Sequence, residues 1–345
     1  MLFRSSTVAE ITDNGTLIGV LEGDVLTIVK GNANYDNKNV GTTKTVTFTG
    51  FAIDGADKGN YTLKEQPASV TADITAKEVT IDGTTVKSTK IYDGNTVAEI
   101  ESNGTLIGVV DGDKLSIVKG KAAYADKNVG TGKTVTFSGF TLEGKDKNNY
   151  VLKVQPASVT ADITVKEVTI TGTTVESTKV YDGNTVAKIT DKGTLNGVEE
   201  RDDLRIVIGK ATYDDKNVGT TKTVTFSGFT LEGEDKDNYV LKVQPASVTA
   251  DITVKEVTID GTTVKSTKIY DGSTVAEITD NGTLIGVVDG DVLTIVKGNA
   301  NYDNKNAGTG KTVTFTGFAI DGADKGNYTL KEQPASVKEI GRAHV

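Results

Sequence analysis

Three copies of a tyrosine–aspartate–glycine triplet are the residues of this chain whose type and spacing best suit chemistry. They are Tyr92-Asp93-Gly94, Tyr181-Asp182-Gly183 and Tyr270-Asp271-Gly272. An exposed tyrosine ring could stack on the face of a sugar. The structural alternative is that Asp-Gly makes a turn, while the tyrosine packs its ring into its own unit with its hydroxyl hydrogen-bonded. We favour the structural alternative, because carbohydrate sites commonly recruit tryptophan and the chain has none.

The usual groups for catalysis near neutral pH are missing from the interior of the sequence. There is no cysteine, and the single histidine is His344, next to the end of the sequence. These residues commonly act as general bases, nucleophiles and metal ligands. The 47 acidic residues make chance carboxylate pairs certain, so such pairs do not argue for a glycoside hydrolase. We therefore expect no enzyme activity, no catalytic residue, no cofactor and no metal ligand.

The segment Gly130-Thr131-Gly132-Lys133 imitates the tail of a phosphate-binding loop. That motif requires a glycine five positions before its second glycine, and Lys127 stands there instead. No helical pattern follows whose N-terminus could hold a phosphate. The segment is better explained as a turn that leads into a strand.

Acidic loops raise the alternative of calcium binding. Examples are Asp111-Gly112-Asp113 and the segment 235–238. Oxygen-rich loops bind calcium in extracellular modules, but the spacing of an EF-hand does not occur here. Lysine lies between the acids, and one copy carries Arg201 in the middle of the loop. We favour solvated turns.

Two covalent modifications are weaker alternatives. Three Asn-Gly-Thr segments fit the glycosylation acceptor pattern but also fit hairpin turns. They begin at Asn14, Asn103 and Asn281. A lysine–asparagine isopeptide cross-link is conceivable, although no pattern in the sequence indicates one.

The elements that must position these residues recur with a fixed period. The tyrosines of the triplets are 89 residues apart in the numbering (92, 181 and 270), and the four prolines keep the same spacing. A unit of this length can fold around a small core of its own. The sequence predicts four repeats with these bounds: 6–76, 77–165, 166–254 and 255–337, the first and last truncated.

The two ends depart from the repeat. Residues 1–5 and 338–345 do not follow the period, and they can be encoded by opposite strands of one short DNA. That DNA resembles a common sequencing adapter. We therefore expect both ends to be translated adapter around a fragment of a longer gene, with His344 not native.

Strand signals dominate each repeat. Residues 133–138 alternate polar and apolar side chains, as a half-buried strand does, and no ten-residue stretch has helical periodicity. Asp82-Gly83 and Asn103-Gly104 are typical of turns. The fold class expected is all-β: a tandem array of small β-sandwich-like units, each with seven or eight strands. The glycine-free junction 163–170 predicts one extended strand between repeats, and hence an elongated rod.

Four segments of each repeat together resemble the YDG domain, a repeat of large bacterial surface adhesins. In the second repeat they are Lys90–Thr96, Asp126–Lys133, Asn149–Leu152 and Ala161–Thr164 with Lys166. The family often has proline where this chain has Ala76, Val165 or Val254. The resemblance implies an exported protein displayed on the bacterial cell surface, filamentous-haemagglutinin-like or autotransporter-like, and makes the three triplets its structural motif.

Function and partners follow from the array and the resemblance together. We expect a non-enzymatic stalk or spacer of an adhesin; alternatively the repeats are multivalent adhesive modules for a host glycan or protein. A hydrolase is a distant third. The partner implied is a host-surface or matrix ligand. The formal charge of −9 argues against nucleic acid and anionic membranes, and no apolar run is long enough for membrane insertion. The fragment is expected to be monomeric and extracellular.

Overall fold

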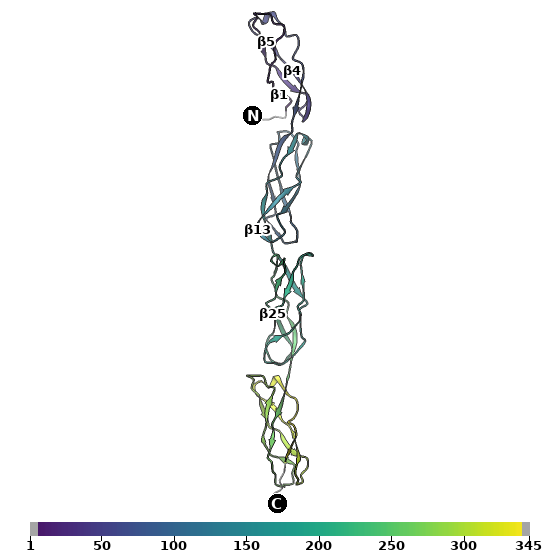
Figure 1. Ribbon diagram of the computed structural model, residues 1–345, viewed down its shortest axis with the longest axis vertical. Coiled ribbons are helices and arrows are strands. Elements are labelled where there is room, and N and C mark those ends of the chain that lie inside the picture. The colour runs from purple at the N-terminus through teal and green to yellow at the C-terminus, as the bar shows by residue number, and fades with distance from the viewer. Residues whose placement is uncertain (1–5, 340–345) are drawn as a thin grey trace. The chain divides into compact units, whose positions relative to one another are not determined.

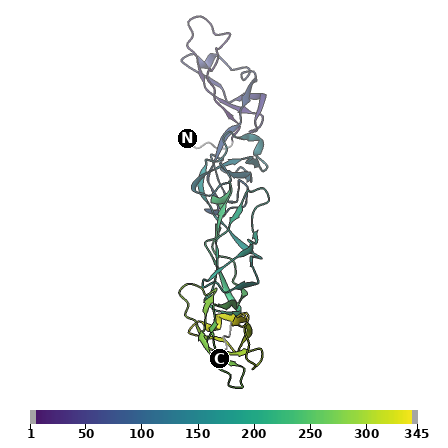
Figure 2. The ribbon, with the colours of Figure 1, turned by 60° about the horizontal axis from the view of Figure 1, so that its bottom comes forward.

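The computed structural model describes residues 6–339, and these residues form strands, loops and four short 3-10 turns (Figure 1, Figure 2). The all-β fold class is therefore confirmed. The predicted adapter residues 1–5 and 340–345 lie outside the described residues, whereas Lys338 and Glu339 belong to the last strand. Two compact units divide the chain, residues 1–165 and 166–345, and each contains two of the predicted repeats.

The elements of the first unit fall into two repeats. Those of repeat 1 are β1 (Val8–Ala9), β2 (Thr27–Val29), β3 (Asn32–Tyr35), β4 (Gly41–Thr49), β5 (Ala52–Asp54), η1 (Lys58–Asn60) and β6 (Val70–Ile74). Those of repeat 2 are β7 (Lys77–Val86), β8 (Thr89–Ile91), β9 (Val97–Ala98), β10 (Ile100–Ile107), β11 (Ser116–Val118), β12 (Lys121–Tyr124), β13 (Gly130–Ser138), β14 (Thr141–Glu143), η2 (Lys147–Asn149), β15 (Tyr150–Leu152) and β16 (Val159–Thr164).

The second unit repeats the same series. Repeat 3 contains β17 (Lys166–Thr171), β18 (Thr174–Val175), β19 (Thr178–Val180), β20 (Val186–Ala187), β21 (Ile189–Asp191), β22 (Thr194–Asn196), β23 (Arg205–Val207), β24 (Lys210–Tyr213), β25 (Gly219–Ser227), β26 (Thr230–Glu232), η3 (Lys236–Asn238), β27 (Tyr239–Leu241) and β28 (Val248–Thr253). Repeat 4 contains β29 (Lys255–Asp260), β30 (Thr263–Val264), β31 (Val275–Ala276), β32 (Ile278–Asp280), β33 (Thr283–Ile285), β34 (Thr294–Val296), β35 (Asn299–Tyr302), β36 (Lys311–Thr316), β37 (Ala319–Asp321), η4 (Lys325–Asn327), β38 (Tyr328–Leu330) and β39 (Val337–Glu339).

Repeat 2 shows how one copy is built. A five-stranded sheet has the order β8-β16-β13-β12-β9, and only its β8–β16 pair is parallel. A three-stranded sheet has the order β10-β7-β15, and β11 pairs with β14 as a ribbon. The prediction of seven or eight strands is wrong, because repeat 2 has ten. Several are only two or three residues long and carry little periodicity that sequence reading could detect.

Two predicted turns are not turns. Asp82-Gly83 lies inside β7 and Asn103-Gly104 inside β10, where these strands pair. Both glycines have positive φ, +73° and +79°, so they kink the strands rather than reverse them. The kink at Gly104 is closely packed: a Cβ there would lie 2.8 Å from Thr84 Oγ1.

The alternating pattern of the long strands builds the core. Val135 in β13 is fully buried, and Phe137 packs edge-to-face on Phe140 with ring centroids 5.9 Å apart. Gln155 fixes this corner, because its amide accepts a hydrogen bond from the Phe140 N–H and donates one to the Phe140 carbonyl. Figure 1 labels β13 and β25, the long strands at the centre of the equivalent sheets in repeats 2 and 3.

The cores of repeats 3 and 4 touch, which departs from the expectation of self-sufficient units. Repeat 4 has a buried cluster of its own around Val313 and Phe315. The cluster of repeat 3, however, also takes in Val257 and Tyr328, which belong to repeat 4. Burying apolar side chains across this boundary stabilises the pair of repeats as one body.

The extended strand predicted for the junction 163–170 is interrupted at one residue, because β16 ends at Thr164 and β17 begins at Lys166. Within the first unit β6 ends at Ile74 and β7 begins at Lys77, and within the second β28 ends at Thr253 and β29 begins at Lys255. The interruption has a physical cause: the strand before it pairs in the larger sheet of one repeat, four-stranded for β6 and five-stranded for β28, and the strand after it pairs in the three-stranded sheet of the next repeat. Beside the apolar contact, neighbouring repeats are joined by polar residues in loops and at strand ends.

Candidate functional site

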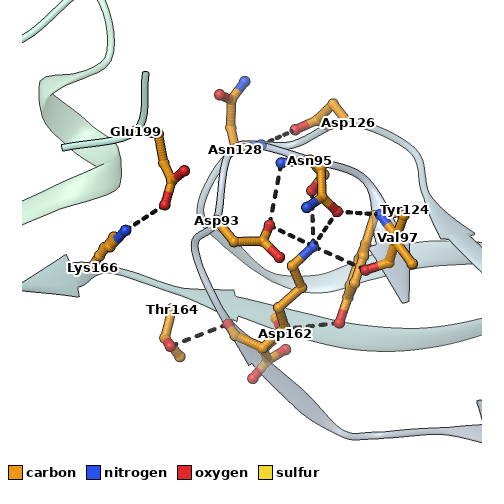
Figure 3. Close-up of polar contacts among 11 residues, drawn as sticks. Asp93, Asn95, Val97, Tyr124, Asp126, Asn128, Asp162, Thr164, Lys166 and Glu199 are labelled. Atoms are coloured by element: carbon orange, nitrogen blue, oxygen red, sulfur yellow. Dashed lines mark hydrogen bonds and ion pairs between the residues drawn. The ribbon is translucent and has the colours of Figure 1, made fainter. Parts of the chain in front are cut away.

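The aspartate of the triplet organises a turn inside its own repeat. The ammonium of Lys90 lies 2.7 Å from Asp93 Oδ1 and donates hydrogen bonds of 2.9 Å to the side chain of Asn95 and to the carbonyl of Val97. Figure 3 shows Asp93, Asn95 and Val97 gathered in this network, with Tyr124 beside them. The Lys90 ammonium also lies 5.8 Å from the centroid of the Tyr124 ring. The lysine thus closes the turn that presents the tyrosine.

The same turn recurs in the other two copies. Lys179 lies 2.7 Å from Asp182, and Lys268 lies 3.0 Å from Asp271. Burial works against ionisation of Asp182, but hydrogen bonds from Lys179 and from the backbone outweigh it, so the pKa of Asp182 is lowered. The backbone hydrogen bond from Ser273, with that from Lys268, lowers the pKa of Asp271 to about 2. These turns are held by charge-assisted hydrogen bonds.

The tyrosine of the triplet leaves its own repeat. The Tyr181 ring is 1% exposed and packs edge-to-face on Tyr328 of repeat 4, with ring centroids 5.4 Å apart. Its hydroxyl donates a 2.7 Å hydrogen bond to Asp291 Oδ2, also in repeat 4. The prediction that the ring packs into its own unit is therefore wrong for Tyr181. The hydroxyl is hydrogen-bonded as expected, but by the neighbour.

The glycine of the triplet makes room for that neighbour. Gly183 has φ +80°, and a Cβ built on it would lie 2.6 Å from Val288 Cγ1 of repeat 4. A side chain at this position would be strained by the backbone and would also clash. Gly272, the equivalent residue of repeat 4, has the same φ but nothing within 4 Å. The difference shows that the crowding at Gly183 comes from the docked repeat.

Asp291 is the hub of this contact. Its side chain is 3% exposed, and it accepts hydrogen bonds from the Tyr328 hydroxyl (2.6 Å), the Tyr181 hydroxyl (2.7 Å) and the Lys216 ammonium (3.1 Å). Burial opposes ionisation of Asp291, but these three donors outweigh it, so its pKa is lowered. Conversely, burial and the hydrogen bond to Asp291 raise the pKa of Tyr328 to about 12. The hydrogen bond to Asp291 raises the pKa of Lys216 to about 12.

An asparagine completes the contact between repeats 3 and 4. Asn327 Oδ1 accepts a 2.9 Å hydrogen bond from the Val218 N–H, and Asn327 Nδ2 donates one of 3.2 Å to Asn217 Oδ1. We call Tyr181, Lys216, Asp291, Asn327 and Tyr328 the docking cluster. Two of these residues, Tyr181 and Lys216, come from repeat 3 and the other three from repeat 4.

Repeats 1 and 2 meet through equivalent residues. The Lys38 ammonium donates a 2.8 Å hydrogen bond to Asp113 Oδ1, and the Tyr150 hydroxyl donates one of 2.7 Å to Asp113 Oδ2. The Val40 N–H donates one of 2.9 Å to Asn149 Oδ1. Each residue lies 178 positions before its counterpart in the docking cluster, as Lys38 does before Lys216. The chain therefore uses one docking chemistry at two junctions.

The three predicted triplets differ in how far their tyrosines are buried. Tyr92 and Tyr181 are each 1% exposed, whereas Tyr270 is 62% exposed. Sequence reasoning missed the partners of the tyrosine, namely the aspartate, lysine and asparagine of the docking cluster. A signal was present, because these three types recur unchanged at the 89-residue spacing. The four copies are Asp24, Asp113, Asp202 and Asp291; Lys38, Lys127, Lys216 and Lys305; Asn60, Asn149, Asn238 and Asn327.

The segment that imitates a phosphate loop is a bulge at the start of β13. The pairing of β13 with β16 shifts between Gly130 and Lys133. The Gly132 N–H donates a 2.8 Å hydrogen bond to the carboxylate of Asp162. The carboxylate of Asp162 therefore already occupies this backbone donor.

The acidic loop 111–113 serves docking. Asp113 accepts hydrogen bonds from Lys38 and Tyr150, which are the wrong partners for a cation ligand. Among residues 6–339, no three acidic, histidine or cysteine side chains lie together as a metal site requires. No helix in that range has the length and apolar character needed to cross a membrane.

Comparison with known families agrees with the repeat geometry. The model of the YDG domain matches the chain four times, at residues 5–70, 75–160, 164–249 and 253–336. No curated protein matches the chain.

Proposed function

Because the chain belongs to the YDG domain family, we propose that it is a non-enzymatic stalk segment of an adhesin on the bacterial cell surface. In this role the repeats provide reach for a binding domain located elsewhere. The observation that carries the proposal is the docking cluster. The recurring polar residues are used to join one repeat to the next, at 38–113 and again at 216–291. A stalk needs such junctions, because freely hinged beads would coil back on themselves.

A charge reversal between copies supports a spacer over an adhesive module. Lys87 lies 2.6 Å from Glu99 in repeat 2. At the aligned positions of repeat 3 both signs are exchanged, and Lys188 lies 2.5 Å from Glu176. The pairing inside the repeat is kept while the polarity shown to the outside is inverted. A ligand that recognised this surface by charge would not bind both copies equally.

The alternative is that the repeats are themselves multivalent adhesive modules. The observation that favours it is the exposed Tyr270 ring, which lines a hollow of about 1060 Å³ in repeat 4. An aromatic ring in a hollow can stack on a sugar. Only one of the three triplet tyrosines shows this exposure, however, and multivalent binding needs several equal sites.

Two experiments test the proposal. In the first, the intact chain is coupled to beads and adhesion to host cells and matrix is measured against blank beads. The stalk proposal expects no excess adhesion, and binding above the blank would favour the adhesive module instead.

The second experiment measures the stiffness of a junction. The chain has no cysteine, so spin labels can be attached to a variant that carries both Lys210→Cys and Lys331→Cys. The distribution of distances between the two labels is then measured by electron–electron double resonance. The docked repeats 3 and 4 are expected to give one narrow distance peak. A broad distribution in the unmodified junction would contradict the stalk role.

A further inference from the structure

The first and the last strands of repeat 3 pair with each other in parallel. β17 pairs with β27, and β19 pairs with β28. Partners are 73 positions apart in both pairs, as Lys166 and Tyr239 are, so the start and the end of the repeat run side by side in one direction and one register. We call the first pair the entry clamp and the second the exit clamp; their residues are Lys166–Val168 with Tyr239–Leu241, and Thr178–Val180 with Asp251–Thr253.

Further hydrogen bonds extend the exit clamp beyond its paired residues. The Asp251 N–H donates a hydrogen bond of 2.9 Å to the Ser177 carbonyl. The Tyr181 N–H donates one of 2.9 Å to the Thr253 carbonyl. The Thr253 hydroxyl donates one of 3.3 Å to the Lys179 carbonyl. The last strand of the repeat is therefore bonded to β19 through both backbone and side chain.

The neighbouring repeats have the same arrangement. Repeat 2 has both clamps, β7 with β15 and β8 with β16, again with partners 73 positions apart. Repeat 4 has the entry clamp, β29 with β38. An ion pair crosses each entry clamp, and its members are Glu78 and Lys153, Glu167 and Lys242, and Glu256 and Lys331. These side chains are all more than half exposed, so each ion pair contributes little and the backbone hydrogen bonds dominate.

Parallel pairing decides how these strands respond to a pull on the chain. Tension reaches repeat 3 at the start of β17 and leaves it at the end of β28, because the repeats follow one another in one chain. The two strands of each clamp are thus pulled from opposite ends and must slide past each other. In this geometry the evenly spaced hydrogen bonds between them are loaded together, whereas strands pulled from the same end separate one pair at a time.

We propose that the two clamps are a mechanical device, which lets each repeat that carries them withstand tension along the chain. Resistance to forced unfolding is set by the unfolding rate rather than by the equilibrium free energy, and loading the clamps in shear slows unfolding for this direction of pull. The proposal goes beyond the stalk role, which concerns reach and the stiffness of junctions. It rests on strand pairing inside one repeat, and it holds equally if the repeats are adhesive modules.

The experiment pulls the entry clamp of repeat 3 in two directions within the intact chain. DNA handles are attached through pairs of cysteines, and the force at the first rupture is measured in optical tweezers at one pulling rate. One variant carries Val165→Cys and Val243→Cys, which load the clamp from opposite ends. The other carries Thr169→Cys and Val243→Cys, which load it from the same end. All three positions are exposed, and the chain has no cysteine of its own.

The opposite-end variant is expected to rupture at about three times the force of the same-end variant, because three residue pairs share the load in one case and break in turn in the other. Moving one handle from residue 165 to residue 169 leaves the enclosed segment almost unchanged, so a role of these strands in stability alone predicts no difference. Equal rupture forces, or a higher force for the same-end variant, would overturn the proposal.

Repeat 2 provides a second set of handles. Circular dichroism shows whether the variants are folded, and if one is not, the same two measurements are made at Ala76, Thr80 and Val154, the counterparts in repeat 2. The same ratio of forces is expected there, and the same results would overturn it. Bead adhesion, which tests the stalk role, does not depend on this ratio, so either proposal can fail without the other.

Discussion

Removal of the Asp291 carboxylate is the sharpest test of the docking cluster. In Asp291→Ala the hydroxyls of Tyr181 and Tyr328 lose a buried charged acceptor at 2.7 and 2.6 Å. Only the bond from Tyr181 crosses the junction, because Tyr328 and Asp291 both belong to repeat 4. A hydrogen bond to a charged group contributes about 1.5 kcal/mol at the low end of the usual range, so the junction loses about 1.5 kcal/mol. The Lys216 ion pair is left out of this sum, because the lysine side chain is 42% exposed and water screens it.

Hydrogen exchange of the Val218 amide measures this loss. That N–H is bonded across the junction to Asn327, so it exchanges when the junction opens. A loss of about 1.5 kcal/mol should speed its exchange roughly tenfold, since 1.4 kcal/mol is a factor of ten. The Val40 amide occupies the same position at the junction of repeats 1 and 2 and serves as the internal control. An unchanged rate at Val218 in a folded variant, or an equal change at Val40, would refute the reasoning.

Three further predictions follow from the same geometry. Gly183→Ala should destabilise docking by about 1–3 kcal/mol more than Gly272→Ala in thermal unfolding, because both residues have φ +80° but only Gly183 faces Val288. Docking should be retained between about pH 4 and 10, as followed by Val218 exchange at matched intrinsic rates. Ionised Asp291, whose pKa is lowered, stabilises the docked state above pH 3.8, and this contribution is lost as pH falls through the lowered value. The protonated hydroxyl of Tyr181, whose pKa is raised by burial and by its hydrogen bond to Asp291, stabilises the docked state below pH 10.0, and this contribution is lost as pH rises through the raised value. Addition of EDTA should leave the melting temperature unchanged, because the recurring Asp113 carboxylate is already held by a lysine and a tyrosine.

The fold class could be predicted from sequence because strand periodicity is a local property. The alternation around Val135 specifies which face of β13 is buried, whatever the rest of the chain does. The strand count could not be predicted, because it depends on where two glycines kink a paired strand. Gly83 and Gly104 leave β7 and β10 continuous in repeat 2, whereas the equivalent kinks divide the strands of repeat 3. Whether the backbone hydrogen bonds continue past such a kink depends on the paired strand, which local sequence does not specify.

The partner of the triplet tyrosine could not be predicted for a different reason. Because the repeats are nearly identical, a contact within one copy and a contact between two copies involve the same residue types in the sequence. Tyr181 could pair with Asp202 of its own repeat or with Asp291 of the next, and the two aspartates are equivalent in the period. The structure resolves this in favour of Asp291, while Asp202 receives the hydroxyl of Tyr239. Proximity in sequence favoured the wrong copy.

Because the same cluster recurs at separate junctions, a substitution at one junction should affect that junction alone. In an array whose units contact only their neighbours, stability is close to a sum of unit and junction contributions. The buried cluster around Val313 belongs to repeat 4 alone, so opening its junction with repeat 3 leaves that core intact. Substitution of Asp291 should therefore create a hinge between repeats 3 and 4 and leave the repeats folded. Since the two junctions described share no residue, their effects should add. A variant altered at both Asp113 and Asp291 is expected to show the exchange change of each single variant, at Val40 and at Val218, with no coupling between them.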